Sequence, residues 1–388
     1  MNEHAVTEEA GRVASPECTA VAQVIGRLGR GGAQRVAFNL ALGLARLDAD
    51  AMAIALREGG DYADGKAGTG VETHVLEMDP ARWGTMLRGV RRLRALVRGR
   101  GIGVLHVHGA DCLPVVYLAT RGLRPPPRVV FTWHDSHRVL KQRGWRRRLM
   151  LAALRRCAAV SGSSRQVTER LGAAIGDGRP VGVLRNGVPT CPEVSRPAGA
   201  TPPRIVWVGR LVPDKAPLAV LGACAALLEQ GRAFRLQMIG DAPVGHEAYG
   251  EHVRGYAREG GLSDHVSFAG WVQDVAGQLA GADIAVQSSC TEGLSMALLE
   301  QMMAGLAIVA TDVGDTAEAL DGGRGGLLVP PNDESALREA LQRLIDEPTL
   351  RGELAAAARQ RAVEHYSLEA MARQAMTMYG AQPTEALA

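Results

Sequence analysis

Short β-rich runs alternate with helical stretches along the chain from about residue 20 onward. This alternation favours parallel sheets that are flanked by helices. We therefore predict an α/β protein. Its strands are expected at 21–25, 51–56, 71–76, 104–107, 129–133, 158–161 and 181–184 in the first half, and at 205–208, 235–239, 266–268, 284–287, 307–310 and 327–329 in the second.

The pattern is interrupted at residues 195–204, S-R-P-A-G-A-T-P-P-R, by Pro, Gly and small residues. The charge changes sign at the same place: residues 1–199 carry 30 Lys and Arg against 17 Asp and Glu, whereas residues 200–388 carry 14 against 24. With 388 residues the chain is also too long for one compact core. We predict two doubly wound domains, at 19–195 and 204–366, with facing sheets and an interdomain cleft. Residues 1–18 are predicted to be a disordered tail.

Composition excludes several classes of protein. The six cysteines, at positions 18, 112, 157, 191, 224 and 290, never fall within four residues of one another, which excludes a cysteine-based zinc or redox motif. No apolar run approaches the ~18 residues that a membrane span requires. The acidic N-terminal segment also lacks the apolar core of a signal peptide. We therefore predict a cytoplasmic protein.

Open α/β sheets bind ligands at the carboxyl ends of their strands, so the loops that follow strands should carry the chemistry. After the first strand comes G-R-L-G-R-G-G-A-Q-R, in which Gly31 and Gly32 open a helix that is expected to begin near Ala33. Glycines allow close approach of a phosphate to free N–H groups at a helix terminus. Plain tight-turn geometry explains them equally well. The spacing does not match the G-x-G-x-x-G pattern of dinucleotide-binding proteins.

Histidines follow two neighbouring strands. His134 and Asp135 lie in T-W-H-D-S-H at the carboxyl end of a strand, and His106 and His108 share one face of the strand before it. A His beside an Asp is a general base with its orienting group, a metal ligand, or a hydrogen-bonded loop pair. For His106 and His108 the alternatives are that one of them lines the cleft or that both are structural, and the structural role is favoured.

The second domain opens with I-V-W-V-G-R-L-V-P-D-K, where Gly209 ends the strand and Arg210 and Lys215 follow it. Lys215 is one of only three lysines beside 41 arginines, and it is the sole lysine of the second half. A flexible ammonium group next to a rigid guanidinium suits the two phosphates of one diphosphate. The alternative is surface pairing of Lys215 with Asp214 or Glu229.

Two carboxylates, Glu292 and Glu300, stand eight residues apart in T-E-G-L-S-M-A-L-L-E with no basic residue nearby in sequence. A buried carboxylate without a partner costs several kcal/mol, so these groups need donors from elsewhere in space or from a ligand. The N–H groups of Gly293, Leu294 and Ser295 begin a helix and are suited to binding an anion.

Together these motifs, with R-N-G-V at 185–188, resemble those of glycosyltransferase family 4 over roughly residues 20–380. The resemblance implies the GT-B fold, with two Rossmann-like domains. The N-terminal domain would bind the acceptor and the C-terminal domain the nucleotide-sugar, and a final helix at 367–380 would cross back to the first domain. It also implies retaining, metal-independent transfer of a sugar from a nucleotide-diphosphate sugar, with no cofactor.

The resemblance also implies roles for individual residues. Arg210 and Lys215, after Gly209, would hold the diphosphate, while Glu292 would bind sugar hydroxyls and Glu300 the ribose. Gly31 and Gly32 would approach the phosphate from the first domain, and Gly293, Leu294 and Ser295 would complete the donor site. His134 would face the sugar near its reacting carbon.

Three positions depart from the family pattern. Asp315 and Ala317 precede Glu318 where a second glycine and a proline are usual, which puts backbone contacts to the donor in doubt. Pro189 follows N-G-V where an Asp is common.

The basic first half bears on the acceptor. Residues 138–156 hold eight basic residues and no acidic one, and 88–100 form a second basic run. Read as a helix, the first segment aligns Trp145, Leu149, Ala152 and Ala153 in a stripe that rests on an anionic membrane or packs on the sheet. No recognition motif for nucleic acid accompanies the charge.

These features predict a peripheral enzyme on the inner face of the cytoplasmic membrane. It would glycosylate a lipid-linked or glycan acceptor in cell-envelope or exopolysaccharide biosynthesis. The alternatives are a nucleotide-sugar epimerase, a sucrose- or trehalose-type synthase on the same fold, or a non-catalytic nucleotide-sugar-binding subunit.

Overall fold

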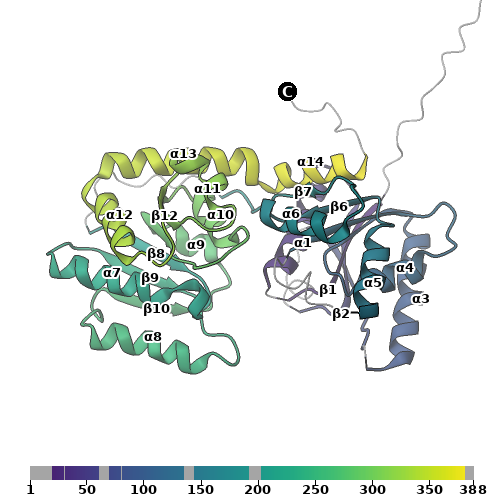
Figure 1. The fold of residues 1–388 in the computed structure, drawn as a ribbon, viewed down its shortest axis with the longest axis horizontal. Helices are drawn as coiled ribbons and strands as arrows, with labels where there is room; N and C mark the ends of the chain where they lie inside the picture. The colour runs from purple at the N-terminus through teal and green to yellow at the C-terminus, as the bar shows by residue number, and fades with distance from the viewer. Residues whose placement is uncertain are drawn as a thin grey trace, which may run out of the picture.

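The computed structural model describes residues 20–29, 31–60, 70–79, 81–134, 144–191 and 202–380, apart from the side chains of Trp145, Arg146 and Leu149. The predicted tail at 1–18 and most of the predicted boundary at 195–204 lie outside the described residues. The described chain forms two parallel sheets in two α/β domains (Figure 1). This confirms the predicted fold class.

The seven-stranded sheet of the N-terminal domain has the order β3-β2-β1-β4-β5-β6-β7, and the six-stranded sheet of the C-terminal domain has the order β10-β9-β8-β11-β12-β13. The strands are β1 (Ala20–Arg27), β2 (Ala51–Glu58), β3 (Glu72–Val75), β4 (Ile102–Val107), β5 (Arg128–Trp133), β6 (Ala159–Gly162), β7 (Gly182–Val183), β8 (Arg204–Val208), β9 (Arg235–Ile239), β10 (Val266–Gly270), β11 (Ile284–Gln287), β12 (Ala307–Thr311) and β13 (Leu327–Val329). Every predicted strand is present. β1 and β2 extend past the predicted apolar residues to Arg27 and Glu58. These two residues are still paired in the sheet, and their side chains form an ion pair.

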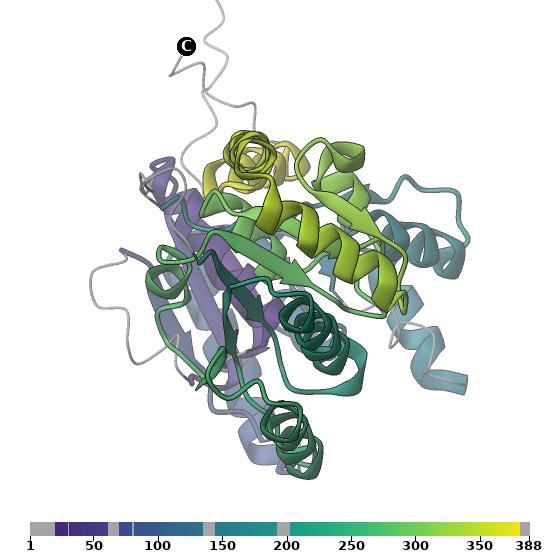
Figure 2. The same cartoon turned by 90° about the vertical axis from the view of Figure 1, so that its left-hand side faces the viewer.

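Helices connect the strands and flank both sheets, as the view from the C-terminal domain shows (Figure 2). In the N-terminal domain these are α1 (Gly32–Arg46), α3 (Trp83–Gly99), α4 (Leu113–Thr120), α5 (Gly144–Leu154) and α6 (Arg165–Ile175). In the C-terminal domain they are the short η1 (Pro213–Lys215), α7 (Pro217–Glu229), α8 (Glu247–Glu259), α9 (Val275–Leu279), α10 (Met296–Met303), α11 (Thr316–Ala319), η2 (Asp321–Gly323), α12 (Glu334–Asp346), α13 (Pro348–Tyr366) and α14 (Leu368–Tyr379).

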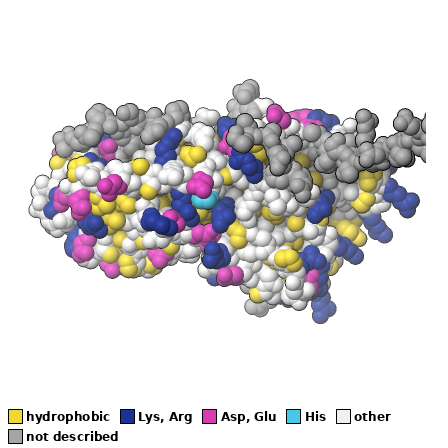
Figure 3. Space-filling model, turned by 90° about the horizontal axis from the view of Figure 1, so that it is seen from above, with side chains coloured by type: hydrophobic (Ala, Val, Ile, Leu, Met, Phe, Trp, Pro, Cys, Tyr) yellow, Lys and Arg dark blue, Asp and Glu magenta, His cyan; other side chains and the backbone are white. Residues whose placement is uncertain are grey.

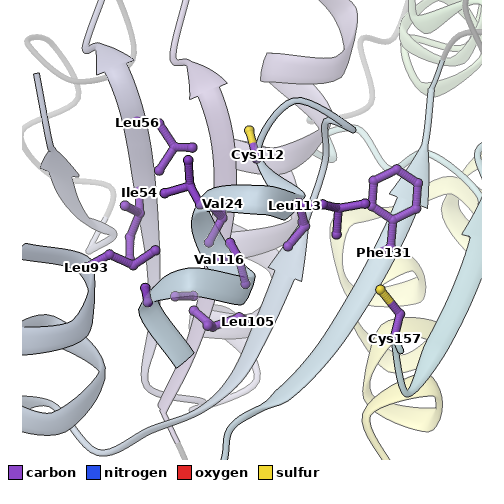
Figure 4. Packing of buried hydrophobic residues seen from close by; sticks show 14 of the residues in the cluster. Val24, Ile54, Leu56, Leu93, Leu105, Cys112, Leu113, Val116, Phe131 and Cys157 are labelled. Carbon is purple, nitrogen blue, oxygen red and sulfur yellow. The ribbon is translucent and has the colours of Figure 1, made fainter. Parts of the chain in front are cut away.

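Apolar residues from α3, α4, α5 and α6 pack on one face of the first sheet. Figure 4 shows part of this core, with Leu93 of α3 and Val116 of α4 beside strand residues such as Ile54. In α5 the buried residues are Met150, Leu151 and Leu154. Of the predicted membrane-or-sheet stripe, Ala153 packs against this core and Ala152 is exposed, while the side chains of Trp145 and Leu149 lie outside the described residues.

The last helix leaves its own domain. Ser367 breaks the run between α13 and α14 with extended backbone, and its hydroxyl caps α14 by accepting from the Ala370 N–H at 3.2 Å. α14 then packs with α1 against the N-terminal sheet (Figure 1). The helices approach closely because Gly43 faces the Leu368 carbonyl, which a Cβ at that position would meet at 2.4 Å. The helix predicted at 367–380 is therefore present and lies on the first domain.

Both sheets reverse their strand order at one point, between β1 and β4 and between β8 and β11. The carboxyl ends of strands part at such a switch point and leave room for a ligand. The predicted site residues follow the strands at these points, namely β1, β8 and β11, or the neighbouring strand β5.

Candidate active site

The loop after β8 supplies the cations that sequence reasoning assigned to a diphosphate. It lies against the end of β9, where the Gly209 N–H donates to the Ile239 carbonyl at 2.9 Å. Gly240, with φ of 123°, permits this contact because a Cβ there would sit 1.9 Å from the Gly209 carbonyl oxygen. Arg210 is exposed and forms no ion pair with any described residue. Its guanidinium is therefore available to an anion.

Lys215 ends η1 and forms an ion pair with Glu292 from the loop after β11. The Ser289 hydroxyl also donates to the same carboxylate oxygen at 2.9 Å. Only 19% of the Lys215 side chain and 17% of the Glu292 side chain are exposed, so each charge compensates the other in a poorly solvated place. The alternative pairing of Lys215 with Asp214 or Glu229 does not occur among the ion pairs of the described residues.

Glu300, in α10, has its cationic partner in the other domain. Arg35 of α1 donates to its carboxylate, and only 11% of the Glu300 side chain is exposed. Arg35 is the last residue of the G-G-A-Q-R motif, and the sequence pattern alone indicated no role for it. The available signal was its place one helical turn after Gly31 and Gly32, since that spacing puts it at the same helix terminus.

Gly31 caps α1 with an extended backbone and Gly32 is its first residue, and both are exposed. The unsatisfied N–H groups of this helix terminus therefore lie one turn from the Arg35–Glu300 pair. At the facing terminus of α10, the Ser295 hydroxyl accepts from the Leu298 N–H at 3.4 Å. Ser295 thus acts as the N-cap of α10, and Gly293 and Leu294 stand just before it.

The segment after β12, where the chain departs from the family pattern, contacts protein groups. Gly314, with φ of 57°, runs against the Glu292 loop, and the Asp315 N–H donates to the Gly293 carbonyl at 2.8 Å. The Asp315 carboxylate accepts from the Arg165 N–H of α6 at 2.7 Å. Glu318 pairs with Arg165 at 3.0 Å and with Arg185 at 2.7 Å. These residues therefore connect the two domains.

His134 lies at the end of β5, in the N-terminal domain. Its Nε2 is 2.9 Å from Nδ1 of His108, and the two rings stack. Both line a cavity of about 470 Å³ with the end of β1 and the start of α1. Burial lowers the pKa of His134 to about 4, so the imidazole is neutral at physiological pH. Asp135, its predicted neighbour in function, lies outside the described residues.

Two family models match the halves of the chain. Residues 30–191 match the model described as Glycosyltransferase Family 4, and residues 202–347 match the model described as Glycosyl transferases group 1. The chain belongs to glycosyltransferase family 4.

Individual relatives are similar to parts of this family 4 member. An exopolysaccharide phosphotransferase of Streptomyces coelicolor is 32% identical over 230 residues, or 58% of this chain and 24% of the relative. The putative colanic acid biosynthesis glycosyltransferase WcaL of Escherichia coli K12 is 33% identical over 171 residues, or 42% of this chain and 41% of the relative. The matched parts thus span less than half the length of these relatives.

Among solved structures, HepE of Anabaena in complex with UDP superposes with a TM-score of 0.77 at 18% identity. The superposition covers 93% of this chain and 100% of HepE. At this identity the likeness shows that the family 4 member shares the GT-B fold.

The structure pairs two of the predicted site residues of this family 4 member with each other and places a third against the first domain. Lys215 meets Glu292, while Glu300 meets the helix that Gly31 and Gly32 open. His134 stands apart from these ion pairs, in the cavity of the first domain. The described residues include no group of three or more His, Cys, Asp or Glu that could hold a metal ion.

A larger cavity than the one beside His134 lies elsewhere. It has a volume of about 620 Å³ and lies at the amino ends of β8, β9 and β10, lined by residues such as Arg204, Arg235 and His265. Because ligands of open α/β sheets bind at the opposite, carboxyl edge, we do not assign this cavity to the donor.

Proposed function

We propose that this family 4 member is a retaining, metal-independent glycosyltransferase. It moves a sugar from a nucleotide-diphosphate sugar to a hydroxyl of a lipid-linked or glycan acceptor, in cell-envelope or exopolysaccharide biosynthesis. The observation that carries the proposal is the pairing of Lys215 with Glu292 and of Arg35 with Glu300 where the loops of the two sheets meet. The names of the polysaccharide-related relatives and the UDP bound by HepE support it.

A nucleotide-sugar would replace the internal ion pairs with contacts of its own. Its diphosphate would accept hydrogen bonds from Lys215 and from Arg210, whose guanidinium has no ionic partner among the described residues. Hydroxyls of the sugar would donate to Glu292, and hydroxyls of the ribose would donate to Glu300. Glu292 and Glu300 would then accept hydrogen bonds from neutral hydroxyls of the donor in place of their ion pairs. The positive charge of Lys215 would be compensated by the diphosphate.

In the transfer step the bond between the anomeric carbon and the diphosphate oxygen breaks, and the bond to the acceptor oxygen forms on the same face. The acceptor proton passes to the departing phosphate oxygen, so no protein base is required. Lys215 and Arg210 stabilise the negative charge that develops on the leaving diphosphate. The low pKa of His134 suits a hydrogen-bonding role better than that of a proton-accepting base.

The proposal is tested with UDP-, GDP-, ADP- and dTDP-sugars in a thermal-shift screen. One donor at 100 times its dissociation constant should stabilise the protein by about 2.7 kcal/mol. The same donor, radiolabelled and incubated with a lipid extract, should transfer label to the lipid or glycan fraction. Epimerised free nucleotide-sugar would indicate the rival epimerase, and binding without any turnover would indicate a non-catalytic subunit.

Replacing Glu300 by glutamine should weaken donor binding about 10- to 100-fold, since a hydrogen bond to a charged group contributes about 1.5 to 3 kcal/mol. Isothermal titration with the identified donor measures this. Glu369→Gln is the matched control, because Glu369 also pairs with an arginine of α1, Arg46, at 3.0 Å, outside the site. Equal affinities of the two variants would remove Glu300 from the donor site.

The acceptor side of the proposal includes contact with an anionic membrane, predicted for residues 138–156. No helix among the described residues is long and apolar enough to cross a membrane. α3 offers a surface for peripheral contact, because Trp83 and Leu87 are 84% and 57% exposed and Arg91 and Arg98 follow along the same side of the helix. Arginine side chains also project from the N-terminal-domain end of the molecule (Figure 3).

Neutralising three exposed arginines of α3, as Arg88→Gln, Arg91→Gln and Arg98→Gln together, should weaken binding to anionic vesicles. Each basic residue near such a surface contributes about 1 kcal/mol, so the loss should be about 100-fold. Vesicle flotation at low salt measures it. The matched control, which replaces three arginines of the C-terminal domain, is Arg258→Gln, Arg324→Gln and Arg343→Gln. Equal flotation of both triple variants would contradict a membrane surface on α3.

A further inference from the structure

A row of hydrogen-bonded, buried polar side chains runs across the N-terminal sheet from Ser161 on β6 to His134. We call it the polar network. It lies on the face that α1 and α14 cover, where Val21, Val104 and Val130 are part of the apolar cluster with those helices. Two residues further along the same strands, the side chains are polar: Gln23 on β1, His106 on β4 and Thr132 on β5. Because side chains alternate along a strand, these residues point to the same face as the valines.

The first part of the polar network links strands β6, β5 and β4 to the crossing helix α14. Thr132 Oγ1 is 2.7 Å from Ser161 Oγ and 2.6 Å from His106 Nε2. The other nitrogen of His106, Nδ1, is 2.7 Å from the hydroxyl of Tyr379 near the end of α14. Thr132, Ser161 and His106 are fully buried, and Tyr379 is 7% exposed. The C-terminal helix thus inserts a hydroxyl into the interior of the first domain.

The second half leads from Tyr379 to the cavity. The Gln23 amide donates from Nε2 to the Tyr379 hydroxyl at 3.4 Å, and its Oε1 is 2.8 Å from Nε2 of His108. Nδ1 of His108 is 2.9 Å from Nε2 of His134. Among the described side chains, every buried polar atom of the polar network has a hydrogen-bond partner.

The Ser161 end of the polar network fixes which group donates and which accepts in each of its hydrogen bonds. The Phe131 carbonyl can only accept, so the Ser161 hydroxyl donates to it at 3.4 Å, and Ser161 Oγ accepts from Thr132. Thr132 must then accept from His106 Nε2–H, which leaves Nδ1 of His106 to accept from Tyr379.

The same order continues to the cavity. The Tyr379 oxygen accepts from Gln23, Gln23 Oε1 accepts from His108 Nε2–H, and His108 Nδ1 accepts from His134 Nε2–H. Each histidine carries its one proton on Nε2, in agreement with the neutral forms that burial imposes.

We propose that Tyr379 and Gln23 are positioning residues that hold His134 in the Nε2–H tautomer and leave its Nδ1 as a hydrogen-bond acceptor for a substrate hydroxyl. The part that concerns the substrate rests on the proposed function. The geometry gives the C-terminal helix a second task besides packing on the first domain, because its last turn sets which hydrogen bond the cavity histidine offers.

Loss of the Tyr379 hydroxyl should release this control. In Tyr379→Phe nothing accepts from Gln23 Nε2, so the amide can also turn its Nε2 toward His108. His108 would then carry its proton on Nδ1 and donate to His134, which would become the Nδ1–H tautomer. His134 should therefore populate both tautomers in the variant.

Nitrogen-15 spectra of the full-length, histidine-labelled protein without substrate distinguish the two tautomers. We expect His134 as Nε2–H in the wild type and as a mixture in Tyr379→Phe. Tyr366→Phe, which removes another buried tyrosine hydroxyl from the neighbouring helix α13, should leave His134 unchanged. A wild-type His134 in the Nδ1–H form, or identical spectra of the two variants, would overturn the proposal whether or not the protein transfers sugar.

The kinetic test uses the identified donor and acceptor. Tyr379→Phe should lower kcat about tenfold relative to Tyr366→Phe while the donor dissociation constant stays the same. Equal kcat values in the two variants would refute the link between the tautomer and the substrate. Failure of the proposed function would appear differently, as absence of turnover in the wild type together with the expected wild-type and variant spectra.

Discussion

Replacing Lys215 by methionine should lower kcat/KM for sugar transfer by roughly 10³-fold, because the variant keeps most of the side-chain volume and loses the charge. Removal of one preorganised group that stabilises developing negative charge typically costs 10²- to 10³-fold in rate. Lys215 is only 19% exposed, so little solvent is present to replace its ammonium group. Initial rates with the identified donor and acceptor measure the effect.

The same substitution also leaves Glu292 without its cation, and this second effect can be separated from the first. A poorly solvated carboxylate that has lost its partner destabilises the fold. The single variant should therefore melt at a lower temperature than the double variant Lys215→Met, Glu292→Gln, in which no uncompensated charge remains. The double variant should be at least as slow as the single variant, because it also loses the Glu292 carboxylate that we propose to bind the sugar. If kcat/KM of the single variant stays within tenfold of the wild-type value, Lys215 does not take part in the reaction. The control is Arg232→Ala, which breaks an ion pair with Asp346 that is remote from the site loops.

Acid should unfold the protein at a higher pH than its carboxylates alone would require. Burial lowers the pKa of His106 to about 3 and that of His134 to about 4, and it holds the pKa of His108 well below its usual value of 6.5. The unfolded chain binds these protons near pH 6.5, whereas the folded chain does not. The stabilisation is therefore complete above pH 6.5 and is lost as the pH falls from 6.5 toward 4.

Each histidine that stays neutral in the folded state should contribute a slope of about 1.4 kcal/mol per pH unit below pH 6, or about 2 kcal/mol at pH 5. Denaturant unfolding at pH 7, 6 and 5 gives this slope. His106→Gln should reduce the slope by about one third of the contribution of the three histidines, even if it also lowers stability at pH 7. His246→Gln, at an exposed position, should not change it. A free energy of unfolding that is constant from pH 7 to pH 5 would contradict the conclusion that the three buried histidines stay neutral in the folded protein.

The two carboxylates of the E-x7-E motif show where sequence reasoning succeeded and where it stopped. It required partners for Glu292 and Glu300 that were distant in sequence, because no basic residue is nearby. It named Lys215 for a diphosphate but did not pair it with Glu292, and it gave Arg35 no role. The two pairings join residues 77 and 265 positions apart, which only the packing of the loops reveals.

The histidines show the same limit. Their placement at strand ends, and the shared face of His106 and His108, followed from the period of two along a strand. Their partner Tyr379 lies 273 residues beyond His106, on a helix whose path depends on the break at Ser367. Nothing local in the sequence near either residue indicates that contact.

The sequence by itself determined the two parallel sheets and each strand, because strand and helix periodicity are local properties of the chain. The family resemblance added the terminal helix and the loops that we propose to bind the donor. Only the tertiary structure decided which charged groups neutralise each other, how Asp315 and Glu318 join the domains, and how α14 reaches the cavity histidine. These contacts depend on distances between segments that fold far apart in sequence, and their energies depend on burial, which no local pattern specifies.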